Sequence, residues 1–490
     1  MEIEVRRNKV VRVGNKLFLV LIIFFLGAVF IILNYAIPPF QNPDEPMHFY
    51  AIMASLKGED KASEIEKEII NFMDKHNWWR FLGLGRPTVL PSRLNEISFL
   101  TQNYPLPDIR ARLNNLVFYH KMASTGLKVI GGESFSLKRV YFILRFVSAF
   151  FALLSLFLIY FVWKKINPLV LKKINFFIDS DFFLNIIPVL LVAFIPQFLI
   201  ISIAVSPDAF CLFLGSVFFA SAFHLALGLR PWVNLILMVL ISLIGFFTDR
   251  SLFFLLVMLL LCLPLGLRRA DFKRSIVMAI GSIFLIMVVI YVSVLIFPLL
   301  MENSFNLLRT ATQSGLAAVK QLFSFEPFSR QFILQLVDSF LICFGWMSFK
   351  VGSLAYWIWR LIILIVAASL FLFAIKRIIK LKSDFKINLV LLKIVFISIT
   401  GLMVQVIGIF AYYGRVGSLP QGRYLFPAIL PLALLLVIGL GNFFSLFWKR
   451  TAIVGFSLIL MVEFFFLNYV LLAQIIPVFH LMIKSPYPGF

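Results

Sequence analysis

The sequence predicts an all-α integral membrane protein with about eleven transmembrane helices and a large loop after the first of them. Of its 490 residues, 61% are hydrophobic and only 14% are charged, whereas soluble domains carry about 25% charged residues. Many separate apolar runs also reach the roughly 20 residues that a helix needs to cross a bilayer. Because these runs are continuous and do not alternate, they favour helices over a transmembrane β-barrel.

The order of apolar runs and basic clusters predicts the topology. A basic segment, residues 1–16, precedes the run 17–37, which is too long for a signal peptide and lacks a small-residue cleavage site. Lysine and arginine collect on the cytoplasmic side, so we expect a plasma-membrane protein with a cytoplasmic N-terminus and all dense basic clusters inside. The expected spans are 17–37, 140–163, 183–205, 209–229, 232–249, 251–267, 275–300, 354–375, 387–411, 424–446 and 452–475.

Two long segments are expected outside the cell. In the first, amphipathic stretches at 63–72 and 113–129 predict helices along the membrane surface. The second, 301–353, contains an aromatic-rich stretch at 332–349 that is too polar for a confident span. The predicted layout is a cytoplasmic tail (1–16), a first helix (17–37), an outer loop (38–139), a helical bundle (140–475) and an outer tail (476–490).

An acidic motif, Pro43-Asp44-Glu45-Pro46, follows the first predicted helix directly. The prolines keep this stretch out of regular helix, and its place at the membrane exit suits a partly desolvated general base. His48 and Tyr50 add a titratable ring and a phenol nearby. The alternative is a solvated turn in which Asp44 or Glu45 caps a surface helix. Residue chemistry alone weighs these two interpretations about equally.

Other polar residues are expected at the same outer face. Asp208, in Ser206-Pro207-Asp208-Ala209, lies at an outer turn, where it either helps to bind a substrate or caps the next helix. Arg423 lies between Gln421 and Tyr424 at the start of a late span, where a guanidinium holds a phosphate bidentately or anchors the helix at the interface.

Two further arginines are candidate partners for an anion. Arg145 lies about one turn into the second predicted span, where it either snorkels or pairs with a buried carboxylate or phosphate. Arg415 follows Tyr412-Tyr413-Gly414 near the outer end of another span. Both lie on the predicted outer side, together with the acidic motif.

Several function classes are disfavoured. The net charge of +22 suggests nucleic acid in a soluble protein, but here the basic residues collect at the ends of apolar runs, as in membrane proteins. The three cysteines are scattered, so neither a disulfide framework nor a zinc site is indicated. No phosphate-binding loop, dinucleotide fingerprint, zinc-protease motif or nucleophile elbow is present. Charges are nearly absent from mid-span positions, which disfavours an ion relay.

The motifs occur in an order that resembles a known family, the prokaryotic membrane proteins catalogued as domain of unknown function 2142. The resemblance spans residues 38–430, and Met47 departs from it, since a small residue is usual there. The matching motifs are Pro43-Asp44-Glu45-Pro46 with His48-Phe49-Tyr50, Ser206-Pro207-Asp208-Ala209, Ser339-Phe340 with Phe344-Gly345-Trp346, and Gln421-Gly422-Arg423-Tyr424 with Pro427.

That family in turn resembles the GT-C superfamily of polytopic glycosyltransferases, whose donors are polyprenyl-phosphate or polyprenyl-diphosphate sugars. The resemblance implies a GT-C-like fold and an inverting sugar transfer to a cell-envelope glycan, lipid or protein at the outer face. Asp44 is the expected base, and Glu45 is expected to orient the acceptor or to bind a divalent metal such as Mg or Mn with Asp44. Residues expected to bind substrate are His48, Tyr50, Arg145, Asp208, Arg415, Gln421, Arg423 and Tyr424.

Arg423 is expected to neutralise the lipid phosphate, facing Asp44 across a space the size of a sugar phosphate. Two other function classes stay open. A transporter or flippase of a lipid-linked glycan predicts inverted repeats or mid-membrane charges, and neither is evident. A non-catalytic protein of envelope assembly predicts that Asp44 and Glu45 are dispensable.

Overall fold

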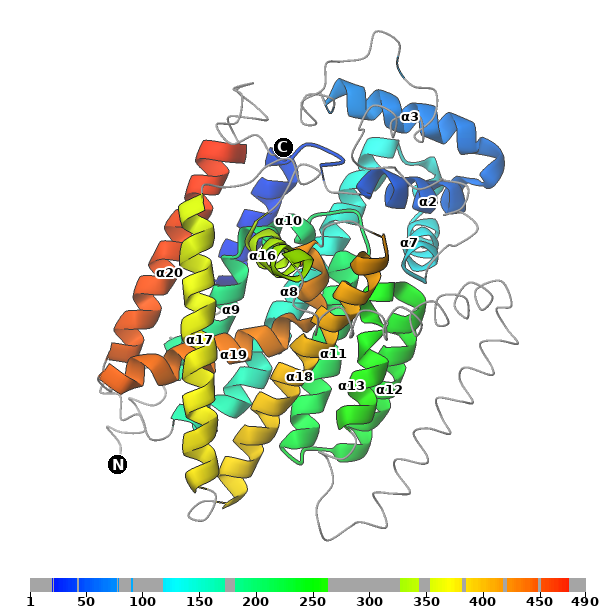
Figure 1. Cartoon of the computed structure of the whole chain (residues 1–490). Helices are drawn as coiled ribbons and strands as arrows, with labels where there is room; N and C mark the ends of the chain where they lie inside the picture. The colour runs from blue at the N-terminus through cyan, green and yellow to red at the C-terminus, as the bar shows by residue number, and fades with distance from the viewer. Residues whose placement is uncertain are drawn as a thin grey trace, which may run out of the picture.

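The computed structural model describes residues 20, 22–41, 44–76, 78, 90, 118–171, 181–262, 327–342, 353–380, 385–416, 421–447 and 451–475. All regular elements in these ranges are helices (Figure 1). They are the first helix (Ile22–Ala36), α2 (Glu45–Lys57), η1 (Glu59–Lys61), α3 (Ala62–Lys75), α7 (Phe118–Val129), η3 (Gly132–Ser134), α8 (Leu137–Leu171), α9 (Asp181–Ala193), α10 (Pro196–Ser202), α11 (Asp208–Ala226), α12 (Pro231–Thr248), η4 (Arg250–Leu252), α13 (Phe254–Cys262), α16 (Pro327–Leu341), α17 (Ser353–Ile379), α18 (Phe385–Val416), η8 (Gly422–Ala428), α19 (Ile429–Phe447), α20 (Thr451–Tyr469) and η9 (Val470–Ile475).

Seven described helices are long and apolar enough to cross a membrane: Leu137–Val170, Asp208–Ala226, Pro231–Thr248, Ser353–Ile379, Ile387–Phe410, Gly422–Leu446 and Val454–Leu472. Each overlaps a predicted span, so the membrane character and the helical class are confirmed. The predicted number of about eleven is not. The described part of the first helix, Ile22–Ala36, is shorter than a span, the described part of 251–267 contains α13 up to Cys262, and 275–300 lies outside the described residues.

The single span expected at 183–205 is broken. Its two helical parts, Leu184–Ala193 and Pro196–Ser202, meet at an angle of 72°. Pro196 supplies no backbone N–H and disfavours helical geometry in the residue before it, so the helix ends there and restarts in a new direction. After α10 the chain leaves helical structure and carries the backbone of Val205 toward the acidic motif.

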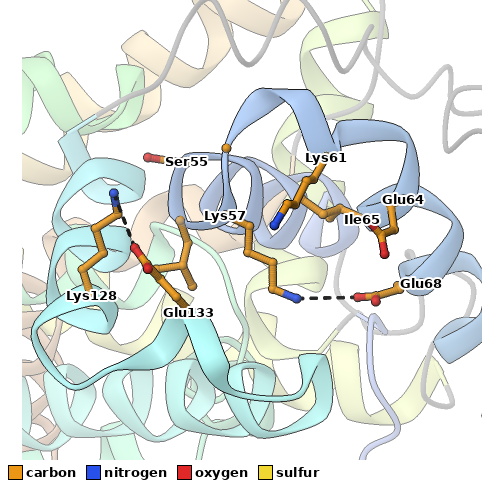
Figure 2. A pocket seen from close by; sticks show the side chains of 10 residues that line it. Ser55, Lys57, Lys61, Glu64, Ile65, Glu68, Lys128 and Glu133 are labelled. Atoms are coloured by element: carbon orange, nitrogen blue, oxygen red, sulfur yellow. Dashed lines mark ion pairs between the residues drawn. The ribbon is translucent and has the colours of Figure 1, made fainter.

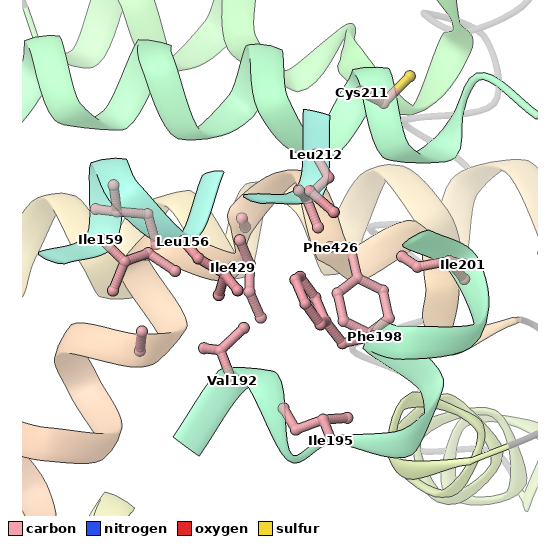
Figure 3. Close-up of a cluster of buried hydrophobic side chains, with 14 of the residues drawn as sticks. Leu156, Ile159, Val192, Ile195, Phe198, Ile201, Cys211, Leu212, Phe426 and Ile429 are labelled. Atoms are coloured by element: carbon pink, nitrogen blue, oxygen red, sulfur yellow. The ribbon is translucent and has the colours of Figure 1, made fainter. Parts of the chain in front are cut away.

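The centre of the bundle is α11, which packs against α8, α12 and η8. Between α8, α9, α10, α11 and η8 lies an apolar cluster that includes Leu156, Phe198, Leu212 and Phe426 (Figure 3). Gly215 lets α11 approach η8 closely, because a Cβ there would lie 2.0 Å from the carbonyl oxygen of Pro427. Small residues at such contacts are typical of helices packed within a membrane.

A group of shorter helices, named here the cap (residues 44–76 and 118–134), lies beyond one end of the bundle (Figure 1). The cap includes α3 and α7, which match the predicted helices at 63–72 and, for its described part, 113–129. α3 buries Ile65, Ile69 and Met73 along one face, as the amphipathic pattern requires. The position of these helices along a membrane surface stays a prediction.

Candidate functional site

Asp44 directs its carboxylate away from the helix that it begins. Its backbone is in the left-handed region, with φ 64° and ψ −3°, a conformation that aspartate tolerates better than most residues. Its carbonyl oxygen accepts hydrogen bonds from the backbone N–H groups of Met47 and His48 at 3.0 Å, and its side chain makes no capping bond to α2. The carboxylate therefore does not play the capping role that the sequence left open. It contacts Arg423.

Arg423 joins two carboxylates from distant parts of the chain. Its Nη2 lies 3.2 Å from Oδ2 of Asp44 and its Nη1 lies 3.3 Å from Oδ2 of Asp208. The guanidinium side chain is only 6% exposed, whereas that of Asp44 is 27% exposed. Nη2 also donates to the Tyr424 hydroxyl at 3.3 Å, and the guanidinium carbon lies 5.1 Å from the centre of that ring. We name Asp44, Asp208, Arg423 and Tyr424 the Arg423 cluster.

Asp208 is the first residue of α11, and Pro207 is its N-cap. The Asp208 carboxylate accepts a hydrogen bond from the Ser206 hydroxyl at 3.0 Å, in addition to the one from Arg423. A carboxylate at a helix N-terminus is stabilised by the helix dipole. Asp208 is therefore held from three sides: by the dipole, the hydroxyl and the guanidinium.

Close backbone packing sets the position of Arg423. The N–H of Gly422 donates to the Ser339 hydroxyl at 2.7 Å, and a Cβ on Gly422 would lie 2.1 Å from the backbone nitrogen of Phe340. Only glycine fits at this contact. The Phe340 ring also stacks on Phe426 with a centroid distance of 4.7 Å. The Ser339-Phe340 motif thus positions η8, and with it the guanidinium.

Glu45, next to Asp44 in sequence, lies in a separate buried network. Its side chain is fully buried, and its Oε1 accepts hydrogen bonds from the Tyr141 hydroxyl at 2.7 Å and from the backbone N–H of Val205 at 2.9 Å. Nε of Arg145 lies 3.8 Å from the same oxygen. The two adjacent carboxylates therefore serve different environments, and Glu45 connects α2 to α8 and to the segment after α10.

Arg145 binds the end of the first helix. Its Nη1 donates to the carbonyl oxygens of Asn34 and Ile37 at 3.0 and 2.7 Å, and its Nη2 donates to that of Pro38 at 2.9 Å. These carbonyls have no partner within the helix, and a buried cation satisfies them. Of the interpretations open from the sequence, the structure shows Arg145 as the buried partner of a carboxylate. Its contacts with phosphate stay a prediction.

The expected metal pair does not fit this geometry. Asp44 and Glu45 carboxylates point to Arg423 and to Tyr141 respectively, so they do not converge. Among the described residues, no group of three or more His, Cys, Asp or Glu side chains is arranged to hold a metal ion. The expected gap between Asp44 and Arg423 also differs from the structure, in which the two side chains are in direct contact.

The other predicted site residues are dispersed. Nδ1 of His48 lies 2.9 Å from Nε2 of His120, with the two rings stacked, and this contact joins α2 to α7. Tyr50 is buried in the core. Gln421 is the N-cap residue of η8, directly before Gly422. Arg415 belongs to α18, and its side chain lies outside the described part.

Two tyrosines were not predicted. Tyr141 precedes Arg145 by four residues on α8, a spacing that places both on one helix face. Its hydroxyl donates to Glu45 and accepts a hydrogen bond from the backbone N–H of Phe40 at 2.9 Å. Tyr119, in the cap, is buried, and this burial raises the pKa of its hydroxyl; the charges of Asp208 and Glu45 act in the same direction. The Tyr119 hydroxyl therefore stays protonated at neutral pH.

Comparison with known proteins identifies one family. The model of a family described as "Predicted membrane protein (DUF2142)" matches residues 24–433, most of the chain. This range includes every member of the Arg423 cluster. No curated protein and no solved structure matches the chain.

Proposed function

The chain belongs to the DUF2142 family of predicted membrane proteins, and from the Arg423 cluster we propose that it is a membrane glycosyltransferase. It transfers a sugar from a polyprenyl-phosphate or polyprenyl-diphosphate donor to a glycan, lipid or protein acceptor of the cell envelope. The observation that carries this proposal is the guanidinium of Arg423 between the carboxylates of Asp44 and Asp208, at the end of the bundle that bears the cap. This arrangement offers one base and one phosphate ligand at a single place.

The proposed reaction is a single displacement. The acceptor hydroxyl oxygen forms a bond to the anomeric carbon of the donor, the bond from that carbon to the phosphate oxygen breaks, and the phosphate leaves as an anion. Asp44 takes the proton of the acceptor hydroxyl, and Arg423 stabilises the negative charge of the leaving phosphate. Asp44 suits the role of base, since its side chain is 27% exposed and that of Asp208, the other carboxylate partner of Arg423, is 14% exposed.

The remaining residues act by position. Asp208 and Tyr424 orient the guanidinium, since both contact it directly. With no donor bound, the two carboxylates compensate a charge that would be costly to bury alone. Glu45 and Arg145 fix the position of Asp44 indirectly, because their contacts hold the start of α2 against the first helix and α8.

The broken span is the feature that favours the alternative of a transporter, because discontinuous helices line substrate sites in many transporters. Here apolar side chains fill the break between α9 and α10. Ile195 and Phe198 lie in the buried apolar cluster with Phe426, and the rings of Phe198 and Phe426 are 6.1 Å apart (Figure 3). The geometry of the described residues therefore supports the transferase better.

Replacing Arg423 by Lys is expected to lower the rate of sugar transfer by about 10–100-fold. The ammonium keeps the charge but loses the planar fork, and a hydrogen bond to a charged group contributes about 1.5–3 kcal/mol. The assay follows product mass in membranes supplied with a polyprenyl-phosphate sugar and an acceptor.

The matched control for this variant is Arg377→Lys. Nη1 of Arg377 donates to Oδ1 of Asn388 at 3.0 Å, beside the turn between α17 and α18, at the end of the bundle opposite the cap (Figure 1). This control tests the general effect of exchanging a hydrogen-bonded arginine for lysine in the bundle. Full activity of Arg423→Lys, or an equal loss in both variants, would reduce Arg423 to a structural anchor.

The proposed orientation places the cap outside the cell and the turn between α17 and α18 inside. In a variant whose three native cysteines are replaced by serine, Asp60→Cys in η1 is expected to react with an impermeant thiol reagent on intact cells. Ile379→Cys, at the end of α17, is expected to react only after permeabilisation. Both positions are exposed. The reverse labelling pattern would contradict the orientation and the assignment of the site to the outer face.

A further inference from the structure

The cap contains a polar cavity of about 430 Å³ between the C-terminal end of α2, η1, α3, α7 and η3 (Figure 2). This volume lies within the range of about 300–1,000 Å³ that is usual for small-molecule sites. Its lining includes three lysines and three glutamates, which are Lys57, Lys61, Lys128, Glu64, Glu68 and Glu133. The three positive and three negative side chains give the lining a net charge of zero.

The ion pairs in this cavity are weak. Nζ of Lys57 lies 3.9 Å from Oε2 of Glu68, and Nζ of Lys128 lies 3.8 Å from Oε1 of Glu133. All four side chains keep part of their surface in water, between 20% and 60%. Exposed pairs of this kind contribute about 0–1 kcal/mol. Charged groups of a ligand can therefore replace either partner at little cost.

Lys61 and Glu64 supply the remaining charges. Within the part of the chain that the structure describes, neither takes part in an ion pair. Figure 2 shows their side chains at the cavity beside the Lys57–Glu68 pair. One ammonium and one carboxylate are thus in place for a ligand, without any internal pair to break.

The lining selects the chemical class of the ligand. An apolar ligand would remove six charged groups from water without giving them partners, at a large cost. A ligand with charge of one sign would face three like charges. A polar ligand that carries both an amino group and an anionic group satisfies both sets, and hydroxyl groups suit the Ser55 side chain.

The direction of α2 relates this cavity to the Arg423 cluster. The helix begins directly after Asp44 and ends at Lys57, so its 13 residues separate the two places by about 20 Å. Every residue of α2 is buried or partly buried, so a ligand reaches the cavity from the surface of the cap and not along this helix. In the proposed reaction the donor has its prenyl tail in the bilayer and its phosphate at Arg423, so the molecule that reaches the cap is the acceptor. We propose that the cavity binds a zwitterionic sugar unit of the acceptor, at a distance of several units from the reacting hydroxyl. That this sugar unit belongs to the acceptor rests on the proposed function, whereas the binding of a zwitterionic sugar rests on the charged lining of the cavity.

The test measures binding to the full chain, purified in detergent, by saturation-transfer NMR titration. The probe is muramic acid, a hexosamine that carries a free amine and a carboxylate. The comparison sugars are glucosamine, which carries only the amine, glucuronic acid, which carries only a carboxylate, and glucose, which is uncharged. Muramic acid is expected to bind about tenfold more tightly than each of the other three, as for one added charge-assisted hydrogen bond.

Lys61→Gln and Glu64→Gln are each expected to weaken muramic acid binding by about tenfold. Lys67→Gln and Glu59→Gln are the matched controls: both residues are exposed in the cap and lie outside the lining, so binding is expected to stay unchanged. Equal binding of muramic acid and glucose, or equal effects of lining and control variants, would overturn the proposal. If the protein shows no sugar transfer but still binds muramic acid, the glycosyltransferase proposal is refuted and the binding site for a zwitterionic sugar is retained.

Discussion

Replacing Asp44 by Asn is expected to lower the rate of sugar transfer by about 10²–10⁴-fold, the usual contribution of a general base. Asparagine has nearly the same size and also tolerates the left-handed backbone conformation at this position. It can still accept a hydrogen bond from Arg423, so donor binding should change far less than the rate. The assay is the transfer reaction followed by product mass, with donor binding measured separately.

The matched control for Asp44→Asn is Asp60→Asn. Asp60 is exposed in η1 of the cap and lies outside the lining of the polar cavity. This control is expected to keep the rate of transfer per folded molecule, because its carboxylate lies at the surface of the cap. An Asp44→Asn protein that inserts normally and transfers sugar at the wild-type rate would rule out Asp44 as the base.

Replacing Arg145 by Met is expected to lower the free energy of unfolding by about 3–5 kcal/mol, the usual result of removing one partner of a buried ion pair. The substitution leaves the buried carboxylate of Glu45 without its cation and three carbonyls at the end of the first helix without a donor. The measurement is unfolding in mixed detergent micelles.

Two comparisons isolate the cause of that loss. The double variant Arg145→Met with Glu45→Gln is expected to recover part of the stability, because the uncompensated carboxylate is gone while the carbonyls stay unpaired. Arg139→Met, on the same helix but exposed, is expected to change stability by less than about 0.5 kcal/mol. An Arg145→Met protein as stable as the Arg139 control would show that the network around Glu45 does not hold the start of α2.

Hydropathy in the sequence predicts the membrane class and the places of seven spans, because each span is a local run of apolar residues. Residue chemistry also selects Asp44, Asp208 and Arg423 as polar groups at the ends of predicted spans, and the resemblance to a known family implies that Asp44 and Arg423 share one site. The break at Pro196 also has a local cause, because proline interrupts a helix. Hydropathy averaged over a window nevertheless predicts one continuous span at 183–205, since it contains no information on a change of helix direction.

The partner of each polar group was decided only by tertiary structure. Asp44 and Glu45 are neighbours with the same chemistry, yet a left-handed backbone at Asp44 and contacts 96 to 379 residues away send one carboxylate to Arg423 and the other to Tyr141. Composition and periodicity describe short stretches of chain, so they carry no information on contacts between residues that are far apart in the sequence. The same reason applies to Arg145, whose choice between phosphate and carbonyl partners depends on where the first helix ends against α8.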